Sequence, residues 1–388
     1  MQEANITVYG APWCPDCRRS KQFLGEQRIP SIWVDIDEDE EARKQVQAVN
    51  DGKQIIPTIV FQDGSLLVEP YNAEVAAKLG ISPKAKREFY DLIVIGGGPA
   101  GLSCAHQLAV SGHEVVVFEA REKLSGLNEY GIAAYKTVNN FAQREVDFIL
   151  QIGGIETRTN QKLGQEVILD DLRKEYDAVF LSVGLGDVNS LGLEGEEPKG
   201  VYDAVETISE LRQSESLKEL SVGRRIVVIG GGNTAIDIAV QSKKLGAEDV
   251  TLTYRRGPEQ MSATWKEQEF AQTNGVRVKH WVAPKCLRSE NGHVTGIEFE
   301  CTELNPEGKL RGTGELRYME ADVVFKAIGQ LLEDSVFSGS EMPAIEGGKI
   351  TVNLEFETSL QGVGAGGDCV DSGEDVTVQS VEDGLERM

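Results

Sequence analysis

The chain has 388 residues, of which 63 are acidic and 39 basic, so its formal net charge is -24 at pH 7. This length suggests two or three domains, and so acidic a surface argues against nucleic acids and anionic membranes as partners. Because no signal-like N-terminus is present and no apolar run approaches the ~18 residues of a membrane span, we expect a cytoplasmic protein without a membrane partner.

The first eighty residues alternate between β-rich runs and charged, amphipathic segments. The predicted elements are a strand over 6–9, a helix over 18–27, a strand over 31–35, a helix over 39–49, strands over 55–61 and 65–68, and a helix from Asn72, its expected cap, to Gly80. The acids of residues 35–41 fall at the N-terminus of the second helix, where they suit the helix dipole better than a metal ion.

Cys14 and Cys17 form the only local pair among six cysteines. Cys14 is expected at a helix N-terminus, where free N–H groups favour a thiolate, and Cys17 lies one turn further along, within reach of a disulfide. The alternatives are half of a zinc site or two buried thiols. Because the four histidines are isolated in the sequence, we predict no metal site.

The segment Trp13-Cys-Pro-Asp-Cys17, together with Ile56-Pro-Thr58, resembles the glutaredoxin and mycoredoxin branch of the thioredoxin fold. This resemblance implies that Cys14 attacks a substrate disulfide, that Cys17 resolves the mixed disulfide, and that Pro57 is a cis-proline facing the pair. Residues 63–72 lack the paired glycines that many glutaredoxins use for glutathione. We assign residues 1–82 to this domain and the polar, proline-containing stretch 83–89 to a linker.

Residues 90–119 read as one strand–helix–strand unit with a glycine turn. Gly96 allows the turn, Gly98 allows the backbone to approach a pyrophosphate, and Gly101 allows the helix to pack on the sheet. Glu119 ends the second strand about 20 residues on, where a carboxylate can accept a hydrogen bond from a ribose hydroxyl. Pro99 and Ala100 complete this predicted dinucleotide site.

A second glycine turn follows the strand that starts at Arg225. Its predicted cofactor-binding residues are Gly230, Gly232, Asn233, Thr234 and Ala235. The next strand, over 249–254, ends in Arg255 and Arg256 rather than in an acid. Guanidinium groups suit a 2′-phosphate, so NADP(H) is favoured over NAD(H); the alternative is a solvated strand end.

Two dinucleotide units in one chain suggest a flavoprotein that takes hydride from a nicotinamide. The Gly367-Asp368 pair resembles that of the two-dinucleotide-domain flavoprotein disulfide reductases, and residues 126–136 and 254–263 resemble glutamate synthase small subunits and the NAD(P)-dependent subunit of dihydropyrimidine dehydrogenase. The resemblance implies FAD, with Asp368 on its ribityl chain. Further expected contacts come from Gly126 and Leu127 in a loop over the cofactor, Gly184 after a buried strand, and Thr377 and Val378 at a helix N-terminus.

The predicted fold class is therefore α/β, a thioredoxin-fold domain followed by Rossmann-like FAD-binding and NAD(P)-binding domains. We place the FAD-binding domain at 90–220 and 331–388, with the NAD(P)-binding domain, 221–330, inserted in it. The relatives named above carry N-terminal iron–sulfur cysteines that this chain lacks, since a [4Fe–4S] cluster needs four thiolates. We expect plain packing for Cys104, Cys286, Cys301 and Cys369, although Cys369 follows Asp368 and could approach the flavin.

The leading functional hypothesis is an NAD(P)H-dependent FAD oxidoreductase that passes electrons to Cys14 and Cys17 and on to a small-molecule or protein disulfide. The alternative is an electron-input subunit that serves a separate partner subunit, as in dihydropyrimidine dehydrogenase or glutamate synthase. A third hypothesis, from another class, is a redox-sensing binding module with structural cofactors. We expect a homo-oligomer in any of these cases.

Overall fold

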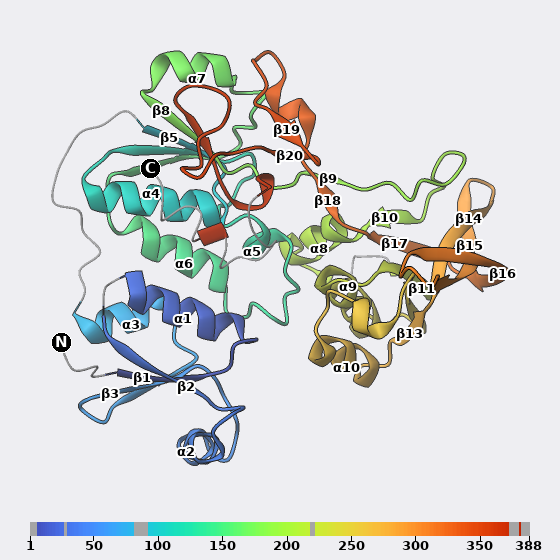
Figure 1. Cartoon of the computed structure of the whole chain (residues 1–388), viewed down its shortest axis with the longest axis horizontal. Helices are drawn as coiled ribbons and strands as arrows, with labels where there is room; N and C mark the ends of the chain where they lie inside the picture. The colour runs from blue at the N-terminus through green and yellow to red at the C-terminus, as the bar shows by residue number, and fades with distance from the viewer. Residues whose placement is uncertain (1–5, 27–28, 81–91, 218–221, 372–379, 382–388) are drawn as a thin grey trace.

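The computed structural model describes residues 6–26, 29–80, 92–217, 222–371 and 380–381, which form three α/β units (Figure 1). In the view of Figure 1 the N-terminal unit lies below the second unit, and the third unit lies to the right of both. The predicted linker, 83–89, lies outside the described residues. No described helix is long and apolar enough to cross a bilayer.

The N-terminal unit, here called the redox module, has a thioredoxin fold, as predicted. Its mixed sheet has the order β2-β1-β3-β4, with β1 parallel to β2 and antiparallel to β3. The elements are β1 (Ile6–Gly10), α1 (Pro15–Glu26), β2 (Ser31–Asp35), α2 (Glu40–Val49), β3 (Thr58–Phe61), β4 (Leu66–Val68) and α3 (Asn72–Leu79). Helix α1 begins earlier than predicted, directly after Cys14.

Two of the helix ends in the redox module follow simple capping rules. Asp39 caps α2 by accepting from the amides of Glu41 and Ala42, and Gly80 ends α3 in the left-handed conformation at φ 67°. Asn72 was wrongly predicted to be the cap of α3. The N-cap is Tyr71, whose amide donates to the Glu74 carboxylate at 2.8 Å, because an acid three residues on can satisfy that free N–H group.

The second unit is built on a parallel sheet of order β21-β8-β5-β6-β7. Its elements are β5 (Leu92–Ile95), α4 (Pro99–Ser111), β6 (Val115–Phe118), α5 (Leu127–Tyr130), α6 (Phe141–Leu150), β7 (Ile155–Arg158), α7 (Leu169–Glu175), β8 (Ala178–Leu181) and β21 (Val363–Ala365). Helices α4 and α6 lie on the side of this sheet that faces the redox module (Figure 1).

The third unit has a parallel sheet of order β10-β17-β11-β12-β13. Its elements are β10 (Val201–Asp203), α8 (Ala204–Gln213), β11 (Arg225–Gly230), α9 (Asn233–Lys244), β12 (Asp249–Tyr254), η2 (Pro258–Gln260), α10 (Trp265–Thr273), β13 (Arg277–His280) and β17 (Val323–Ala327). The predicted start of this unit, residue 221, is too late. Strand β10 pairs with β17, so the chain enters the sheet before α8.

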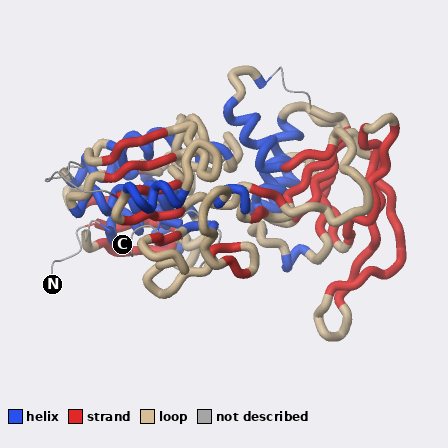
Figure 2. Tube along the Cα trace, turned by 90° about the horizontal axis from the view of Figure 1, so that it is seen from above, coloured by secondary structure: helices blue, strands red, loops and turns tan. Residues whose placement is uncertain are grey.

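A second, antiparallel sheet covers the outer face of the third unit (Figure 2). It consists of β14 (Val282–Glu290), β15 (His293–Leu304) and β16 (Leu310–Glu320), and its buried Phe299 and Ile297 share a core with Val227 and Ile229 of β11. Two short strands, β9 (Asp187–Val188) and β18 (Gln330–Leu331), pair where the chain crosses between the second and third units. The remaining short elements are η3 (Asp334–Phe337), β19 (Ile345–Glu346), β20 (Lys349–Ile350) and η4 (Gly367–Cys369).

Buried thiols in the second unit fill space in its core, as predicted. Cys104 on α4 and Cys369 in η4 are 1% and 0% exposed. Burial raises the pKa of each thiol to about 12, because a thiolate would lose its hydration there. Both groups therefore stay protonated at neutral pH and pack as small apolar side chains.

The sheet of the second unit should depend strongly on Phe180, which is 1% exposed in β8. We expect Phe180→Ala to lower the stability of this sheet by about 3–5 kcal/mol, because truncation leaves a cavity that the packed neighbours cannot fill. Native-state hydrogen exchange of β5 and β8 amides measures the change. Val110→Ala is the control, since Val110 is 51% exposed in the same unit and its truncation should change the stability by less than about 0.5 kcal/mol.

Candidate functional site

The redox module carries a disulfide between Cys14 and Cys17, with the Cα atoms 5.3 Å apart. Cys14 is 4% exposed and Cys17 is fully buried, so only Cys14 has any surface for a reaction partner. The Cys17 amide donates to the Cys14 sulfur at 3.1 Å. A helix N-terminus that already directs an N–H group at this sulfur would stabilise its thiolate after reduction.

Pro57 lies beside the disulfide in the arrangement that the sequence predicted. The Ile56–Pro57 peptide bond is cis, and the Ile56 carbonyl oxygen is 3.9 Å from the Cys14 sulfur. Gly10 closes the other side, because a Cβ there would lie 2.9 Å from the Cys17 sulfur. No group of three or more potential metal ligands occurs among the described residues.

The first glycine turn leaves the N-terminus of α4 open. Gly98 is the N-cap and carries no capping side chain, and a Cβ on it would meet only the Gly126 Cα, at 3.9 Å. Gly96 has φ 109°, and a Cβ on Gly101 would lie 1.9 Å from the Gly96 oxygen, so both positions require glycine. Among the described residues, no side chain caps the free N–H groups at the start of this 13-residue helix, and the backbone at Gly98 has little packed against it.

Glu119 braces this turn from the end of β6. Its carboxylate accepts from the Gly97 amide and from the Arg121 amide, each at 2.8 Å. Burial raises the pKa of this carboxyl group, while the two amide bonds act in the opposite direction. Sequence reasoning placed Glu119 near a ribose hydroxyl, and the structure adds this role in holding the glycine turn.

Several of the other predicted FAD-binding residues gather around the same turn. A Cβ on Gly367 would lie 2.9 Å from the Ala100 side chain, so η4 abuts the first turn of α4, and Asp368 accepts from the Ser380 hydroxyl at 3.0 Å. Gly184 has φ 64° with open space around it. Gly126 and Leu127 lie at the start of α5, next to Gly98. Thr377 and Val378 lie outside the described residues.

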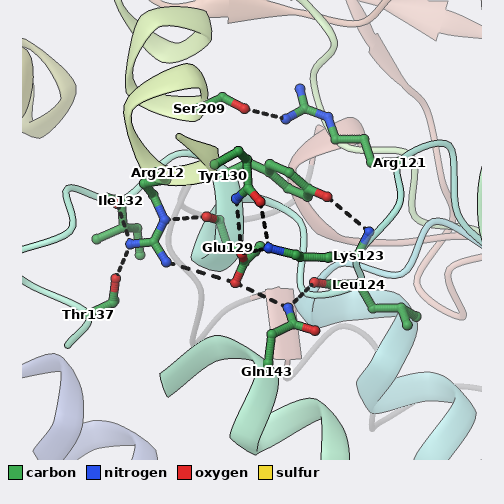
Figure 3. A network of polar contacts seen from close by, with 11 residues as sticks. Arg121, Lys123, Leu124, Glu129, Tyr130, Ile132, Thr137, Gln143, Ser209 and Arg212 are labelled. Carbon is green, nitrogen blue, oxygen red and sulfur yellow. Dashed lines mark hydrogen bonds and ion pairs between the residues drawn. The ribbon is translucent and has the colours of Figure 1, made fainter. Parts of the chain in front are cut away.

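The loop that carries α5 is fastened to the third unit by a buried polar network (Figure 3). At its centre is Glu129, 4% exposed, which accepts from Gln143 at 3.1 Å and Gln213 at 3.0 Å and pairs with Lys123 at 3.4 Å. Arg212 of α8 donates to the carbonyls of Glu129 and Ile132. Lys123 and Glu129 of the second unit and Arg212 of the third unit thus fix the loop beside the first glycine turn.

The second glycine turn has the same open geometry. Gly232 is the N-cap of α9 without a capping side chain, and a Cβ on it would approach only the Ser262 hydroxyl, at 3.2 Å. Gly230 has φ 154°, and a Cβ there would lie 2.1 Å from the Ala327 oxygen. Ala235 is fully buried under the helix, whereas Asn233 and Thr234 retain exposure at its first turn.

Arg255 and Arg256 follow β12 directly, at the edge where the second glycine turn lies. Arg255 is exposed and Arg256 is half-buried. Within the described part of the chain, neither guanidinium group forms an ion pair, although the Arg255 carbonyl accepts from Thr302 at 2.7 Å. Their charges are therefore available to an anion at the end of this strand.

The two turns fit dinucleotides on structural grounds. Each has a parallel strand, a glycine in the left-handed region, an uncapped helix start and a small residue packed beneath the helix. These are the features that bring backbone N–H groups to a pyrophosphate. The residues that would hold FAD surround Gly98, and those that would hold NAD(P) surround Gly232.

Sequence reasoning missed the contacts that join the units. Lys266 of α10 lies 3.1 Å from the centroid of the Trp13 ring, and Lys136 pairs with Asp237 of α9 at 2.6 Å. These partners are far apart in the chain, and no local pattern in the sequence connects them.

Arg212 offers a test of the network around Glu129. We expect Arg212→Met to make residues 126–137 more mobile, because the buried carbonyls of Glu129 and Ile132 lose their charged hydrogen-bond donor. The Glu129 carboxylate keeps its other partners in this variant. A cost of about 2–4 kcal/mol is expected for such a loss. Hydrogen exchange of peptides covering 126–137 measures it, and Arg212→Lys, which keeps the charge, should show a smaller change. Unchanged exchange in both variants would contradict this role.

Comparisons with known proteins agree with this architecture. Residues 90–384 match the pyridine nucleotide-disulphide oxidoreductase family, and residues 6–66 match glutaredoxin. The glutamate synthase [NADPH] small chain of Escherichia coli is 35% identical over 344 residues, 82% of this chain and 72% of that protein. The NADPH-Fe(3+) oxidoreductase subunit beta of Geobacter sulfurreducens is 35% identical over 247 residues, 61% of this chain.

The chain spans less than half the length of several of these relatives, including 36% of the Geobacter subunit and 40% of the NADP(+)-dependent formate dehydrogenase subunit beta of Moorella thermoacetica. Among solved structures, the thioredoxin reductase of T. acidophilum superposes with a TM-score of 0.60 at 19% identity, over 76% of this chain and 95% of that one. Mycobacterium tuberculosis FprA in complex with NADPH gives 0.65 at 19% identity, over 77% and 83%. At 19% sequence identity these structures share the fold of this chain. The matches over residues 90–384 and 6–66 show that the chain belongs to the pyridine nucleotide-disulphide oxidoreductase family and carries a glutaredoxin domain at its N-terminus.

Proposed function

We propose that the chain is an NAD(P)H-dependent FAD oxidoreductase that reduces the Cys14–Cys17 disulfide and, through it, an external disulfide. The observation that carries this proposal is the placement of the redox module, whose Trp13, next to Cys14, contacts α10 of the nicotinamide-binding unit. A dithiol held against the dinucleotide-binding units is suited to receive electrons within the same chain.

When bound, FAD would accept hydride from the nicotinamide. The chain's own residues would position the cofactors and carry out the thiol–disulfide chemistry. Reduction breaks the Cys14–Cys17 bond, and two electrons with two protons give two thiols. The Cys14 thiolate, beside the Cys17 amide at 3.1 Å, would then attack a substrate disulfide, breaking its S–S bond, forming a mixed disulfide and releasing the first substrate thiol. Attack by Cys17 would release the second substrate thiol and restore the Cys14–Cys17 bond.

Pro57 and Ile56 would shape the approach to Cys14. The Ile56 carbonyl faces the Cys14 sulfur at 3.9 Å, which leaves the exposed side of this sulfur to a substrate, either a small molecule or a protein. Cys17 is fully buried and cannot meet an external disulfide first. The order of attack, Cys14 before Cys17, follows from this difference in exposure.

NADP(H) is our proposed nicotinamide cofactor. Arg255 and Arg256 stand at the end of the second strand of the dinucleotide unit, where a 2′-phosphate would lie, and two similar proteins carry NADPH in their names. FAD is proposed for the first turn, with Glu119, Gly126 and Asp368 around it.

A second candidate function is that of an electron-input subunit. The glutamate synthase small chain and the beta subunits of two other oxidoreductases are parts of larger enzymes by name. In that case electrons would pass from the flavin to a separate protein, and the redox module would be an accessory. Activity that survives loss of Cys14 would favour this function.

Replacement of Cys14 separates the two candidates. We expect Cys14→Ser to leave the bleaching of flavin by NADPH unchanged and to abolish reduction of a disulfide such as 5,5′-dithiobis(2-nitrobenzoic acid), because a hydroxyl cannot exchange with a disulfide. Cys286→Ser is the control and should retain full activity, since Cys286 lies on the outer sheet. Wild-type protein whose flavin bleaches while Cys14 and Cys17 stay oxidised would contradict the proposal.

The two arginines should decide the nicotinamide preference. We expect Arg255→Ala and Arg256→Ala each to raise KM for NADPH about 10-fold or more, since a charged hydrogen bond to a phosphate contributes about 1.5–3 kcal/mol. KM for NADH should change little, because NADH lacks the phosphate. Arg311→Ala, on the outer sheet, is the matched control, and equal loss with both cofactors would refute a phosphate-binding role.

A further inference from the structure

The redox module is docked on α6 of the FAD-binding unit by a stack of arginine and aromatic groups. The rings of Tyr71 and Phe141 lie 5.2 Å apart, the Arg144 guanidinium lies 3.9 Å from the Tyr71 ring, and the Arg19 guanidinium lies 4.7 Å from the Phe141 ring. Two groups come from the module and two from α6. Such stacks combine burial with cation–π attraction, so they hold one orientation.

A second contact reaches the module from the nicotinamide-binding unit. Lys266, in the first turn of α10, lies 3.1 Å from the Trp13 ring and 5.5 Å from the ring of its neighbour Trp265. Trp13 also donates to the Asp37 carboxylate at 2.7 Å, which orients its ring. Because Trp13 directly precedes Cys14, this lysine acts on the turn that carries the reactive sulfur.

The same turn of α10 is also tied to the FAD-binding unit. Glu267 pairs with Lys136 at 3.0 Å, and Lys136 pairs with the buried Asp237 of α9 at 2.6 Å. Tyr135 donates to Asp237 at 2.9 Å. Two successive residues, 266 and 267, therefore contact the redox module and the loop of the FAD-binding unit.

We propose that Lys266 is a positioning residue for electron transfer to the dithiol. Its contact with Trp13 holds Trp13, and with it Cys14, in a fixed position relative to the nicotinamide-binding unit. This inference rests on the proposed function. The transfer it assists is balanced, since the Cys14–Cys17 disulfide takes up two electrons and two protons and the reduced flavin returns to its oxidised form. Lys266 itself exchanges neither electrons nor protons.

The test compares Lys266→Met, which removes the charge and keeps the length, with Lys266→Arg, which keeps the cation. In a single turnover with NADPH we expect Lys266→Met to bleach the flavin at the wild-type rate and to form thiols at Cys14 and Cys17 about 2- to 5-fold more slowly, the scale of one exposed cation–π contact. Lys266→Arg should restore the rate. Lys21→Met is the matched control, because Lys21 lies 5.2 Å from the Trp33 ring within the redox module.

A second measurement needs no cofactor. After reduction with dithiothreitol, Cys14 of Lys266→Met should react with iodoacetamide about 2- to 5-fold faster than in wild type, because Trp13 is released. Wild-type rates for Lys266→Met in both measurements, or equal effects from Lys21→Met, would overturn the inference. If wild-type protein bleaches its flavin without gaining thiols, the proposed function fails, and the alkylation rates still decide whether Lys266 positions Cys14.

Discussion

The free backbone N–H groups at the start of a helix need a partner, and three of the described helices begin at the dithiol or at a glycine turn. In α1 an N–H group meets the Cys14 sulfur, while α4 and α9 begin at Gly98 and Gly232 with no side-chain cap. Each site attracts negative charge, as a thiolate or as a pyrophosphate. The electron path that we propose runs between these three helix starts.

The units are joined by polar groups as well as by aromatic contacts such as Phe23 with Phe148. Arg212 donates to the carbonyls of the α5 loop, and Lys136 joins Asp237 and Glu267. Charged groups removed from water are costly unless they are paired. These contacts therefore contribute more to a single arrangement of the units than to the free energy of unfolding. A small set of side chains thus determines how the dithiol, the first glycine turn and the second glycine turn face one another.

The fold and both glycine turns could be predicted because their signals are local. A strand, a glycine turn and a helix follow one another within about 20 residues, and the Gly96 and Gly101 geometry follows from sterics alone. Residues 201–203, which form β10, fell within the predicted FAD-binding domain because so short a strand without a buried residue leaves no clear signal in the sequence. The outer sheet was not predicted, because much of β16 is exposed and charged and so lacks the apolar pattern of a buried strand. Contacts between units, such as Lys266 with Trp13, depend on how the domains pack and leave no pattern in the sequence.

The other four cysteines differ from the pair that we propose as the electron exit, Cys14 and Cys17. Cys104 and Cys369 are buried, and the pKa of each thiol is raised to about 12, so neither supplies a thiolate at neutral pH. Cys286 and Cys301 lie on neighbouring strands of the outer sheet but do not face each other, since Cys286 pairs with Glu298 and Cys301 with Val282. If electrons leave this chain through a dithiol, the pair in the redox module is the one whose geometry and surroundings allow it.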